Sequence, residues 1–316
     1  VVVIGYGAVK KKDATGSVTS ISSKDFNKGT VVTAENLLNG KVAGVTINAG
    51  GGAPGATPTI RIRGGSSLLA SNDPLVVVDG IQGNMDLLNQ VPPSEIESID
   101  VLKDASATAV YGSRGAPGVI IVTTKKNKAG KTTIEYTGST SVDFIPKKLD
   151  MLNADQWWQT AQSVGVPASS NHGSNTNWYG LLTETGITQT HTLSFGGGTD
   201  KFNYRASITA IMQDGVVINS SNQKYIGRIQ ATQLALNDKL KLTFNLNSGI
   251  NNTTSSIGSI GTVAYTSNLI TNALLARPTD PVYNTDGTYF TDATVFHYLN
   301  PYAAAQEVTN ERQEDN

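Results

Sequence analysis

The sequence predicts two parts: a small α+β domain up to about Lys131, followed by the first strands of an antiparallel transmembrane β-barrel. Three observations support this fold class. Helical segments and short buried strands alternate in the first part, whereas apolar and polar residues alternate strictly in the second. Only 16% of the 316 residues are charged, against about 25% in average globular proteins, which argues against a helical bundle.

The composition excludes several classes of protein. The 24 basic and 25 acidic side chains leave a formal charge of −1, so no whole-chain field attracts nucleic acid. Cysteine is absent, which excludes a disulfide framework and a thiolate metal site. No apolar run approaches the roughly 18 residues of a membrane-spanning helix, so a membrane-spanning region would have to be built from strands.

The first part is expected to begin with an extended run, Val1–Ile4, that has no local partner and is suited to pairing with the sheet edge of another protein. An ordinary first strand of a globular domain is the alternative. The segment TAENLLNGKVAGVTI then predicts a helix capped by Thr33. Gly40 and Gly44 limit this helix to a couple of turns.

Strands and a second helix follow. TIRIRG predicts a strand with Arg61 and Arg63 on one cationic face, and PLVVVDG and GVIIVTTKK predict fully buried strands. Between them, Ser94 and Glu97 have the spacing of a capping box. A strand at residues 99–102 and a helix at residues 105–111 are expected after it.

The second part has a period of two. Three strongly alternating segments, KTTIEYTGSTSVDF, KFNYRASITAIM and KLKLTFNLNSGI, and two weaker ones, THTLSFG and KYIGRIQATQL, predict five strands. Their connections alternate between long and short, which is typical of an outer-membrane barrel with plain periplasmic turns and elaborated external loops. A soluble β-sandwich is the alternative, but its water-facing side would carry more Lys and Glu than the Ser, Thr, Asn and Gln found here.

Enzymatic signatures are missing, so the sequence predicts a protein that is not an enzyme, with no catalytic residue, cofactor or metal. The histidines His172, His191 and His297 lack metal-ligand spacing. GYGAVKKK lacks the third glycine of a dinucleotide-binding loop. Asp79-Gly80 is interpreted as a turn in which glycine takes a positive φ.

Several stretches together resemble the SusC/RagA-like TonB-dependent outer-membrane transporters of Bacteroidota. They are VVVIGYG, LLNGKVAGVTI, RIRGGSSLLASNDPLVVVDG, IESIDVLKDASATAVYGSRGAPGVIIVTTKK and NPYAAAQEVTNER. The resemblance covers nearly all of residues 1–127 and part of the remainder, and the combination and order of the motifs are highly specific.

The resemblance implies a domain organisation. Residues 1–7 would be the TonB box, with Val1, Val2, Val3, Ile4, Gly5 and Tyr6 bound by TonB through strand addition. Residues 8–128 would form the plug domain, and residues 129–316 the N-terminal part of a barrel of about 22 strands, incomplete because five strands cannot close one. The residues alone allow two interpretations of Arg61 and Arg63: solvated cations on a strand face, or tentative plug–barrel contacts with carboxylates on the inner wall of a surrounding barrel.

The resemblance also implies a function: TonB-dependent import of an oligomeric nutrient, a glycan first and a peptide second, across the outer membrane. The expected partners are TonB with its ExbB and ExbD energising complex, a SusD-like surface lipoprotein, the substrate and outer-membrane lipid, with dimers of SusC–SusD-like pairs conceivable and no nucleic acid. The plug would face the periplasm, and the substrate-binding residues stay unassigned. Alternatives are a non-transporting receptor or adhesin barrel and a siderophore-type transporter.

Overall fold

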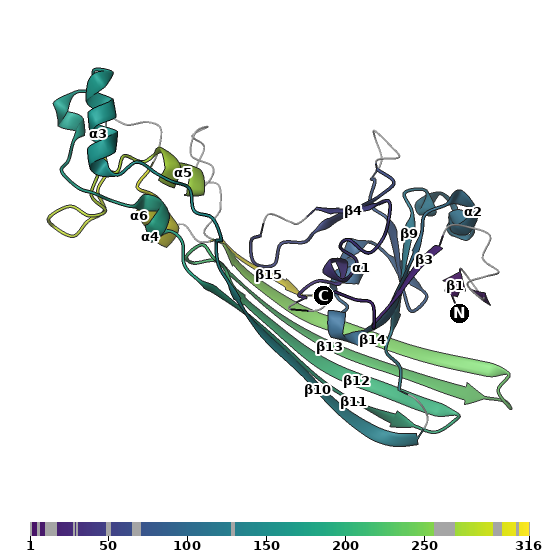
Figure 1. Cartoon of the computed structure of the whole chain (residues 1–316). Helices are drawn as coiled ribbons and strands as arrows, with labels where there is room; N and C mark the ends of the chain where they lie inside the picture. The colour runs from purple at the N-terminus through teal and green to yellow at the C-terminus, as the bar shows by residue number, and fades with distance from the viewer. Residues whose placement is uncertain are drawn as a thin grey trace.

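The computed structural model describes residues 2–4, 7–9, 18–27, 29, 31–48, 52–64, 71–127, 130–255, 269–292, 299–307 and 310–315. Two bodies make up this part of the chain (Figure 1). An N-terminal domain lies on the concave side of a long, curved antiparallel sheet, and helices α3 to α6 gather beyond one end of that sheet. The α+β domain followed by barrel strands, as the sequence predicts, is confirmed.

A mixed sheet of five strands forms the core of the N-terminal domain, which we call the plug. Its order is β3-β8-β9-β6-β7, with β6 parallel to β9 and every other pair antiparallel. The strands are β3 (Val18–Ser22), β6 (Leu75–Val78), β7 (Ile81–Gly83), β8 (Ile96–Leu102) and β9 (Val119–Thr124). Strands β6 and β9 are apolar runs because both of their faces are covered, one by each of two hydrophobic clusters.

Short helices and two hairpins surround this sheet. The helical elements are η2 (Ala34–Leu37), α1 (Met85–Asn89), η3 (Pro93–Glu95), α2 (Ala105–Thr108) and η4 (Ala109–Gly115). One hairpin pairs β4 (Val45–Asn48) with β5 (Thr59–Ile62), and the other pairs β1 (Val2–Ile4) with β2 (Gly7–Val9).

Three sequence-based expectations for the plug are wrong in detail. Residues after Thr33 form one 3-10 turn instead of a longer helix, and the Thr33 side chain does not cap it. Glu97 lies in β8, so Ser94 and Glu97 form no capping box. The strand expected at 99–102 begins at residue 96, and the helix expected at 105–111 is a short α-helix that continues as a 3-10 helix.

The second sheet, which we call the wall, contains six consecutive antiparallel strands in sequence order. They are β10 (Gly130–Asp143), β11 (Gly186–Gly198), β12 (Phe202–Asp214), β13 (Ser221–Ala235), β14 (Leu240–Ser255) and β15 (Asn310–Asp315). The five predicted strands are all present. The sixth, NERQED, was missed because it is wholly polar and has no alternation.

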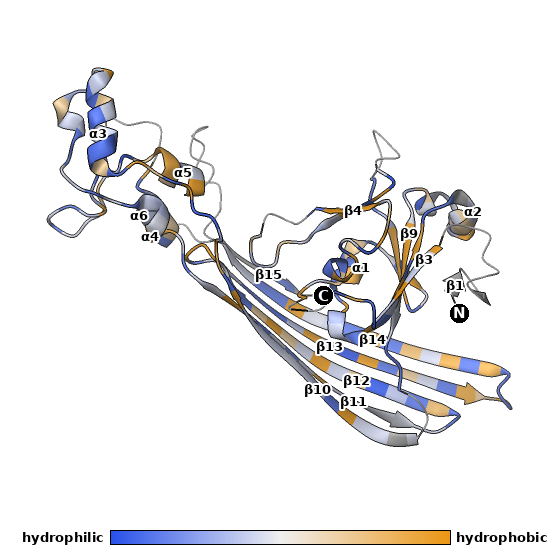
Figure 2. Cartoon of the chain, in the orientation of Figure 1, coloured by the Kyte–Doolittle hydropathy of each residue, from blue (hydrophilic) through white to orange (hydrophobic). Residues whose placement is uncertain are grey.

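The two faces of the wall have opposite chemistry, and Figure 2 shows the resulting alternation along its strands. On β12, the residues Arg205, Ser207 and Thr209 are buried against the plug. Phe202 and Ile208 on the other face are exposed, Ile208 by 64%. An exposed apolar face backed by a polar inner face is the arrangement of a lipid-facing barrel strand.

The long connections of the wall fold together beyond one end of the strands. Helices α3 (Ala154–Ser163), α4 (Trp178–Leu181), α5 (Leu269–Leu275) and α6 (Pro301–Glu307) come from them. Trp178, Leu182, Leu269 and Ala305 form the buried centre of a small apolar cluster there. No helix in the described ranges is long and apolar enough to cross a membrane.

Candidate functional site: the contact between plug and wall

A buried ion pair joins the plug to the middle of the wall. The Arg205 guanidinium donates from Nε to Glu95 Oε2 at 2.9 Å and from Nη2 to Glu95 Oε1 at 2.8 Å. The two side chains are only 9% and 3% exposed. Two parallel hydrogen bonds fix both the position and the orientation of the partners.

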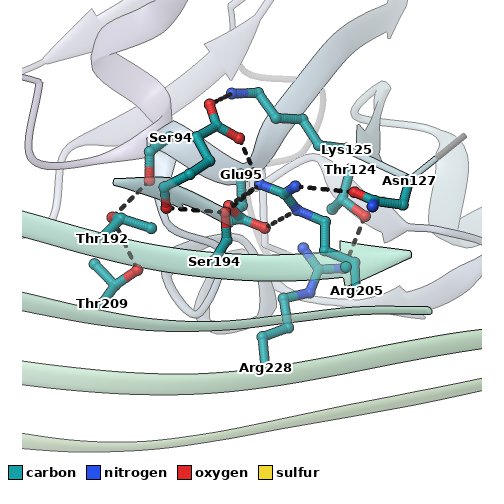
Figure 3. Close-up of polar contacts among 12 residues, drawn as sticks. Ser94, Glu95, Thr124, Lys125, Asn127, Thr192, Ser194, Arg205, Thr209 and Arg228 are labelled. Atoms are coloured by element: carbon teal, nitrogen blue, oxygen red, sulfur yellow. Dashed lines mark hydrogen bonds and ion pairs between the residues drawn. The ribbon is translucent and has the colours of Figure 1, made fainter. Parts of the chain in front are cut away.

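Neighbouring side chains complete the surroundings of Arg205 (Figure 3). Its Nη2 also donates to Ser194 Oγ at 2.9 Å and to Glu135 Oε2 at 3.2 Å. Its Nη1 donates to Asn127 Oδ1 at 3.4 Å. Burying a guanidinium is favourable only when its donors are satisfied, and here residues of both the plug and the wall satisfy them.

A second ion pair joins Arg228 of the wall to Asp79, which lies in the turn between β6 and β7. Asp79 and Gly80 both have a positive φ, of 49° and 93°, as a two-residue type I′ hairpin turn requires. Asp79 Oδ2 accepts hydrogen bonds from Arg228 at 2.7 Å and from Thr124 Oγ1 at 2.5 Å. The expected turn is therefore present, and its aspartate additionally holds the wall strand β13.

A line of hydroxyl groups continues this contact along the wall. Ser94 Oγ and Thr192 Oγ1 are 2.8 Å apart, and Thr192 Oγ1 and Thr209 Oγ1 are 3.1 Å apart. These groups link η3 to β11 and β12 through hydrogen bonds. Small hydroxyl residues suit an inner face against which another domain packs closely.

A third pair of opposite charges lies nearer the loop end of the wall. Glu35 of the plug is fully buried, and neither of its carboxylate oxygens forms a hydrogen bond of good geometry with the described residues. Burial raises the pKa of this carboxyl group, while the positive charge of Lys224 on β13 acts in the opposite direction. Lys224 Nζ donates to the carbonyl oxygen of Asn89 at 2.7 Å.

A glycine-rich plug loop, residues 52–58, reaches the wall beside this pair. The Gly55 amide donates to Gln213 Oε1 at 3.3 Å. Gly55 has a φ of +72°, and a Cβ atom at this position would collide with the side chain of Asn222. Only glycine satisfies both the backbone conformation and the close approach. This loop, the end of α1 and the wall line a cavity of about 740 Å³ that is open to solvent on one side.

The predicted plug–barrel contacts of Arg61 and Arg63 are not the ones that join the two bodies here. Arg61 pairs with Asp73, and Arg63 pairs with Asp104. Both carboxylates belong to the plug itself. Contacts of Arg61 and Arg63 with a barrel wall stay a prediction.

The predicted TonB-binding residues fall at the start of the chain. The expectation that this run has no local partner is wrong for Val2, Val3 and Ile4, which form β1 and pair with β2 in a hairpin. Val1, Gly5 and Tyr6 lie outside the described residues. Binding of these residues to TonB stays a prediction. Among the described residues, no three His, Cys, Asp or Glu side chains come together as metal ligands would.

The residues that actually join plug and wall were missed by sequence reasoning. In the sequence, Glu95 is simply the residue after Ser94 of the expected capping box, Asp79 belongs to an expected turn, and Arg205 is one polar residue among several on a strand. A weak signal did exist. Arg205 and Arg228 are basic residues on strands whose polar positions are otherwise mostly Ser, Thr, Asn and Gln, and a cation facing the inside of a barrel needs a counter-charge there.

Comparisons with known proteins agree with this architecture. Residues 10–119 match the TonB-dependent Receptor Plug Domain. The chain is 40% identical to TonB-dependent receptor SusC of Bacteroides thetaiotaomicron over 92% of this chain and 29% of that protein. It is 39% identical to TonB-dependent receptor P3 of Formosa agariphila over 100% of this chain and 31% of that protein.

A solved structure shows the same fold. The RagAB peptide importer in its open-open state superimposes with a TM-score of 0.80 at 27% identity, covering 96% of this chain and 38% of that one. The chain thus spans about three tenths of the length of the curated relatives it matches.

A plug held by buried ion pairs against a curved wall of antiparallel strands defines a plugged outer-membrane β-barrel. The chain belongs to the SusC-like TonB-dependent receptors, a family of outer-membrane transporters and not of enzymes.

Proposed function

We propose that the complete protein imports an oligomeric nutrient across the outer membrane, using energy delivered by TonB. The buried Glu95–Arg205 pair is the observation that carries this proposal. It fastens the plug inside the curve of the wall, at the place where a substrate would have to pass. A pathway blocked in this way opens only if the plug is shifted or partly unfolded, which requires work.

The energy that shifts the plug would be delivered through the N-terminal segment of the chain. Val2–Ile4 is a short strand of β-branched residues preceding the plug, and an extended segment of this kind can add to the sheet edge of a partner through its main-chain donors and acceptors. We propose that TonB, energised by ExbB and ExbD, binds residues 1–6 in this way. Strand addition to β1 would compete with its pairing to β2.

A SusD-like surface lipoprotein would deliver the nutrient from outside. The loop helices α3 to α6 extend well beyond the wall strands and provide surface for such a partner (Figure 1). Support comes from the relatives, since one is named SusC and another is described as a peptide importer named RagAB. Each pair of transporter and SusD-like lipoprotein would associate with a second such pair as a dimer.

Substitution of Val3 tests the TonB step without knowledge of the nutrient. Val3→Pro removes one backbone donor from the strand, whereas Val3→Thr keeps the donor and the β-branched shape. Capture of the full-length protein carrying each change is measured on the immobilised periplasmic domain of TonB. We expect Val3→Pro to abolish capture and Val3→Thr to preserve it; capture of both variants at the wild-type level would refute strand addition at this segment.

A further inference from the structure

We propose that two copies of this protein contact each other within the membrane through a polar patch on the lipid-facing side of strands β10 and β11. The patch consists of Tyr136, Thr140, Gln189 and His191. This surface would join the transporter pairs whose association is part of the proposed function, on which the inference therefore rests.

The alternation of side chains places the patch on the outer face of the wall. On β11, Thr192 and Ser194 are buried on the inner face, and the two patch residues of this strand have the opposite parity. On β10, Glu135 reaches inward to Arg205, and both patch residues of that strand again have the opposite parity. Successive side chains of a strand point to opposite faces, so all four members of the patch point toward lipid.

Apolar side chains border the patch at both ends of the same face. Toward the loop end of the wall they are Val142 and Ile187, which lie opposite each other on β10 and β11. Toward the other end they are Ile134 and Phe195, which also lie opposite each other. All four are exposed. The polar patch is therefore enclosed in the apolar band that a barrel of this type turns to the hydrocarbon core.

The two neighbouring strands carry no such patch. From Phe202 to Met212, the outward-facing residues of β12 are Phe, Tyr, Ala, Ile, Ala and Met. From Tyr225 to Ala231, those of β13 are Tyr, Gly, Ile and Ala. Imidazole and carboxamide groups in the middle of the apolar band are thus a local property of β11 and not a general feature of this face.

The members of the patch contact one another. The hydroxyl oxygen of Tyr136 and Nδ1 of His191 are 2.7 Å apart, and the two rings are stacked with centroids 6.1 Å apart. His191 Nε2 and Gln189 Oε1 are 3.4 Å apart. Gly138, which lies opposite His191, makes room for this arrangement, because a Cβ atom there would be 2.7 Å from the Tyr136 hydroxyl oxygen.

These internal contacts leave hydrogen-bonding groups unused. Among the described residues, none accepts a hydrogen bond from the Gln189 amide nitrogen, and none pairs with the hydroxyl group of Thr140 on the adjacent strand. Hydrocarbon offers no partner to such groups, and polar side chains within a membrane are costly unless they are paired. A protein surface that covers the patch would supply the missing partners.

A purely structural role accounts for only part of the patch. An aromatic ring at position 136 covers Gly138, and phenylalanine would cover it equally well. Leucine at positions 189 and 191 would meet lipid at a lower cost than an amide and an imidazole. The polar groups are therefore unfavourable in a wall that meets lipid alone.

The chemistry of the patch suits a second copy of the same chain. Hydroxyl, amide and imidazole groups each can donate and accept hydrogen bonds, so the same residues can serve on both sides of a two-fold contact, as an isologous interface requires. The patch contains no Asp, Glu, Lys or Arg, so two copies bring no like charges of these residues together. Small residues, Gly138 and Ala210, flank His191, and small residues allow close approach at interfaces in membranes.

The oligomeric state of the full-length protein in mild detergent, measured by sedimentation over a range of concentrations, tests the proposal. Gln189→Leu combined with His191→Leu replaces polar groups by side chains that suit lipid, so the change does not oppose folding of the wall. We expect a dimeric wild type and a dissociation constant about tenfold or more higher in the double variant. Gln233→Leu, at an exposed outward-facing position near the other end of β13, is the matched control and should dimerise as the wild type does.

Two results of the sedimentation experiment would overturn the proposal. One is a monomeric wild type, and the other is a double variant that dimerises as tightly as the wild type. Thermal unfolding in the same detergent verifies that the variants compared are folded. Neither a nutrient nor TonB enters the measurement, so its failure is distinct from a failure of the import function.

Cysteine cross-linking locates the contact in the membrane. The chain has no cysteine, so a single introduced thiol reports on one position. Thr140→Cys in the full-length protein should give cross-linked dimers with a short bis-maleimide in isolated outer membranes. Ile229→Cys, at a position exposed by 45% on the outer face of β13, should not. Equal cross-linking at both positions, at Ile229 alone or at neither would overturn the proposed surface.

Discussion

Glu95 of the plug and Arg205 of strand β12 are joined by two parallel hydrogen bonds of 2.8 and 2.9 Å, although 110 positions separate them in the chain. Both side chains are nearly inaccessible to solvent. A buried pair of this kind contributes little net stability over an apolar contact, but breaking it is costly because one charge stays behind unpaired. It therefore specifies where the plug sits, and it resists any displacement of η3 from the wall.

Replacing Arg205 by Met should loosen the plug. The change leaves the Glu95 carboxylate buried without its bidentate partner, and we expect a loss of about 3–5 kcal/mol in the free energy of unfolding. Denaturant unfolding of the full-length protein in detergent measures this loss. Lys239→Met, at an exposed turn of the wall, removes an equal charge and should change the stability by less than about 0.5 kcal/mol. Equal losses for the two variants would contradict a specific role of the pair.

The buried carboxyl group of Glu35 predicts a pH dependence of stability. Its pKa is raised in the folded state, so the folded protein holds this proton more tightly than the unfolded chain. This contribution to stability is complete below the unfolded pKa and is lost as the pH rises through the folded pKa. Glu35→Gln should therefore weaken the dependence of the free energy of unfolding on pH, and it should raise the unfolding midpoint at neutral pH.

Unfolding midpoints of the full-length protein measured across a pH series test the Glu35 prediction. Glu97→Gln, at an exposed position of the same domain, controls for the loss of one negative charge. The prediction fails if wild type and Glu35→Gln show parallel profiles, or if Glu35→Gln is the less stable protein at neutral pH.

Gly55→Ala should detach the plug loop from the wall. A methyl group at this position collides with the Asn222 side chain, and the φ of +72° adds strain. We expect faster hydrogen exchange of residues 52–58 than in the wild type. Gly52→Ala is a matched control, because its φ of +79° is similar but a Cβ atom there meets no neighbour. Identical exchange in the two variants would show that backbone strain alone, and not the contact with Asn222, governs the loop.

Arginine substitutions on the outer face of the wall test which residues meet lipid. Ile208→Arg places a charge in the middle of β12 and should cost about 2–4 kcal/mol, whereas Leu240→Arg, at the first residue of β14, should cost about 0–1 kcal/mol. Both wild-type side chains are exposed on the apolar face, by 64% and 40%. Denaturant unfolding of the full-length barrel in lipid vesicles measures both. A cost for Leu240→Arg that equals or exceeds that for Ile208→Arg would contradict the lipid-facing assignment.

Local patterns were enough to predict most of the fold. Strict alternation located five wall strands, and fully apolar runs located β6 and β9. Both signals arise from the period of side chains along one strand, so a sequence shows them without knowledge of any partner. Elements without such a pattern were misjudged: β15 is polar at every position, and β8 begins three residues before its predicted start.

The site could not be predicted in the same way. The sequence shows Glu95, Asp79, Arg205 and Arg228 as four separate charged residues, each with an ordinary local explanation. Contacts between plug and barrel were predicted for Arg61 and Arg63 instead. In the structure, the carboxylate partners of these two residues lie in the plug itself. Nothing in the spacing of these residues shows which plug carboxylate will face which strand, because the pairs span more than a hundred positions.

The sequence by itself therefore determined the two bodies, the alternation that turns one face of the wall to lipid, and the family to which the chain belongs. Those properties depend on local periodicity and on motifs that are continuous in the chain. Only the tertiary structure decided that Glu95 meets Arg205, that Gly55 lies against Asn222, and that residues of both bodies line one cavity. Such contacts depend on how the plug docks against the wall, and docking is fixed by burial and charge pairing summed over both surfaces.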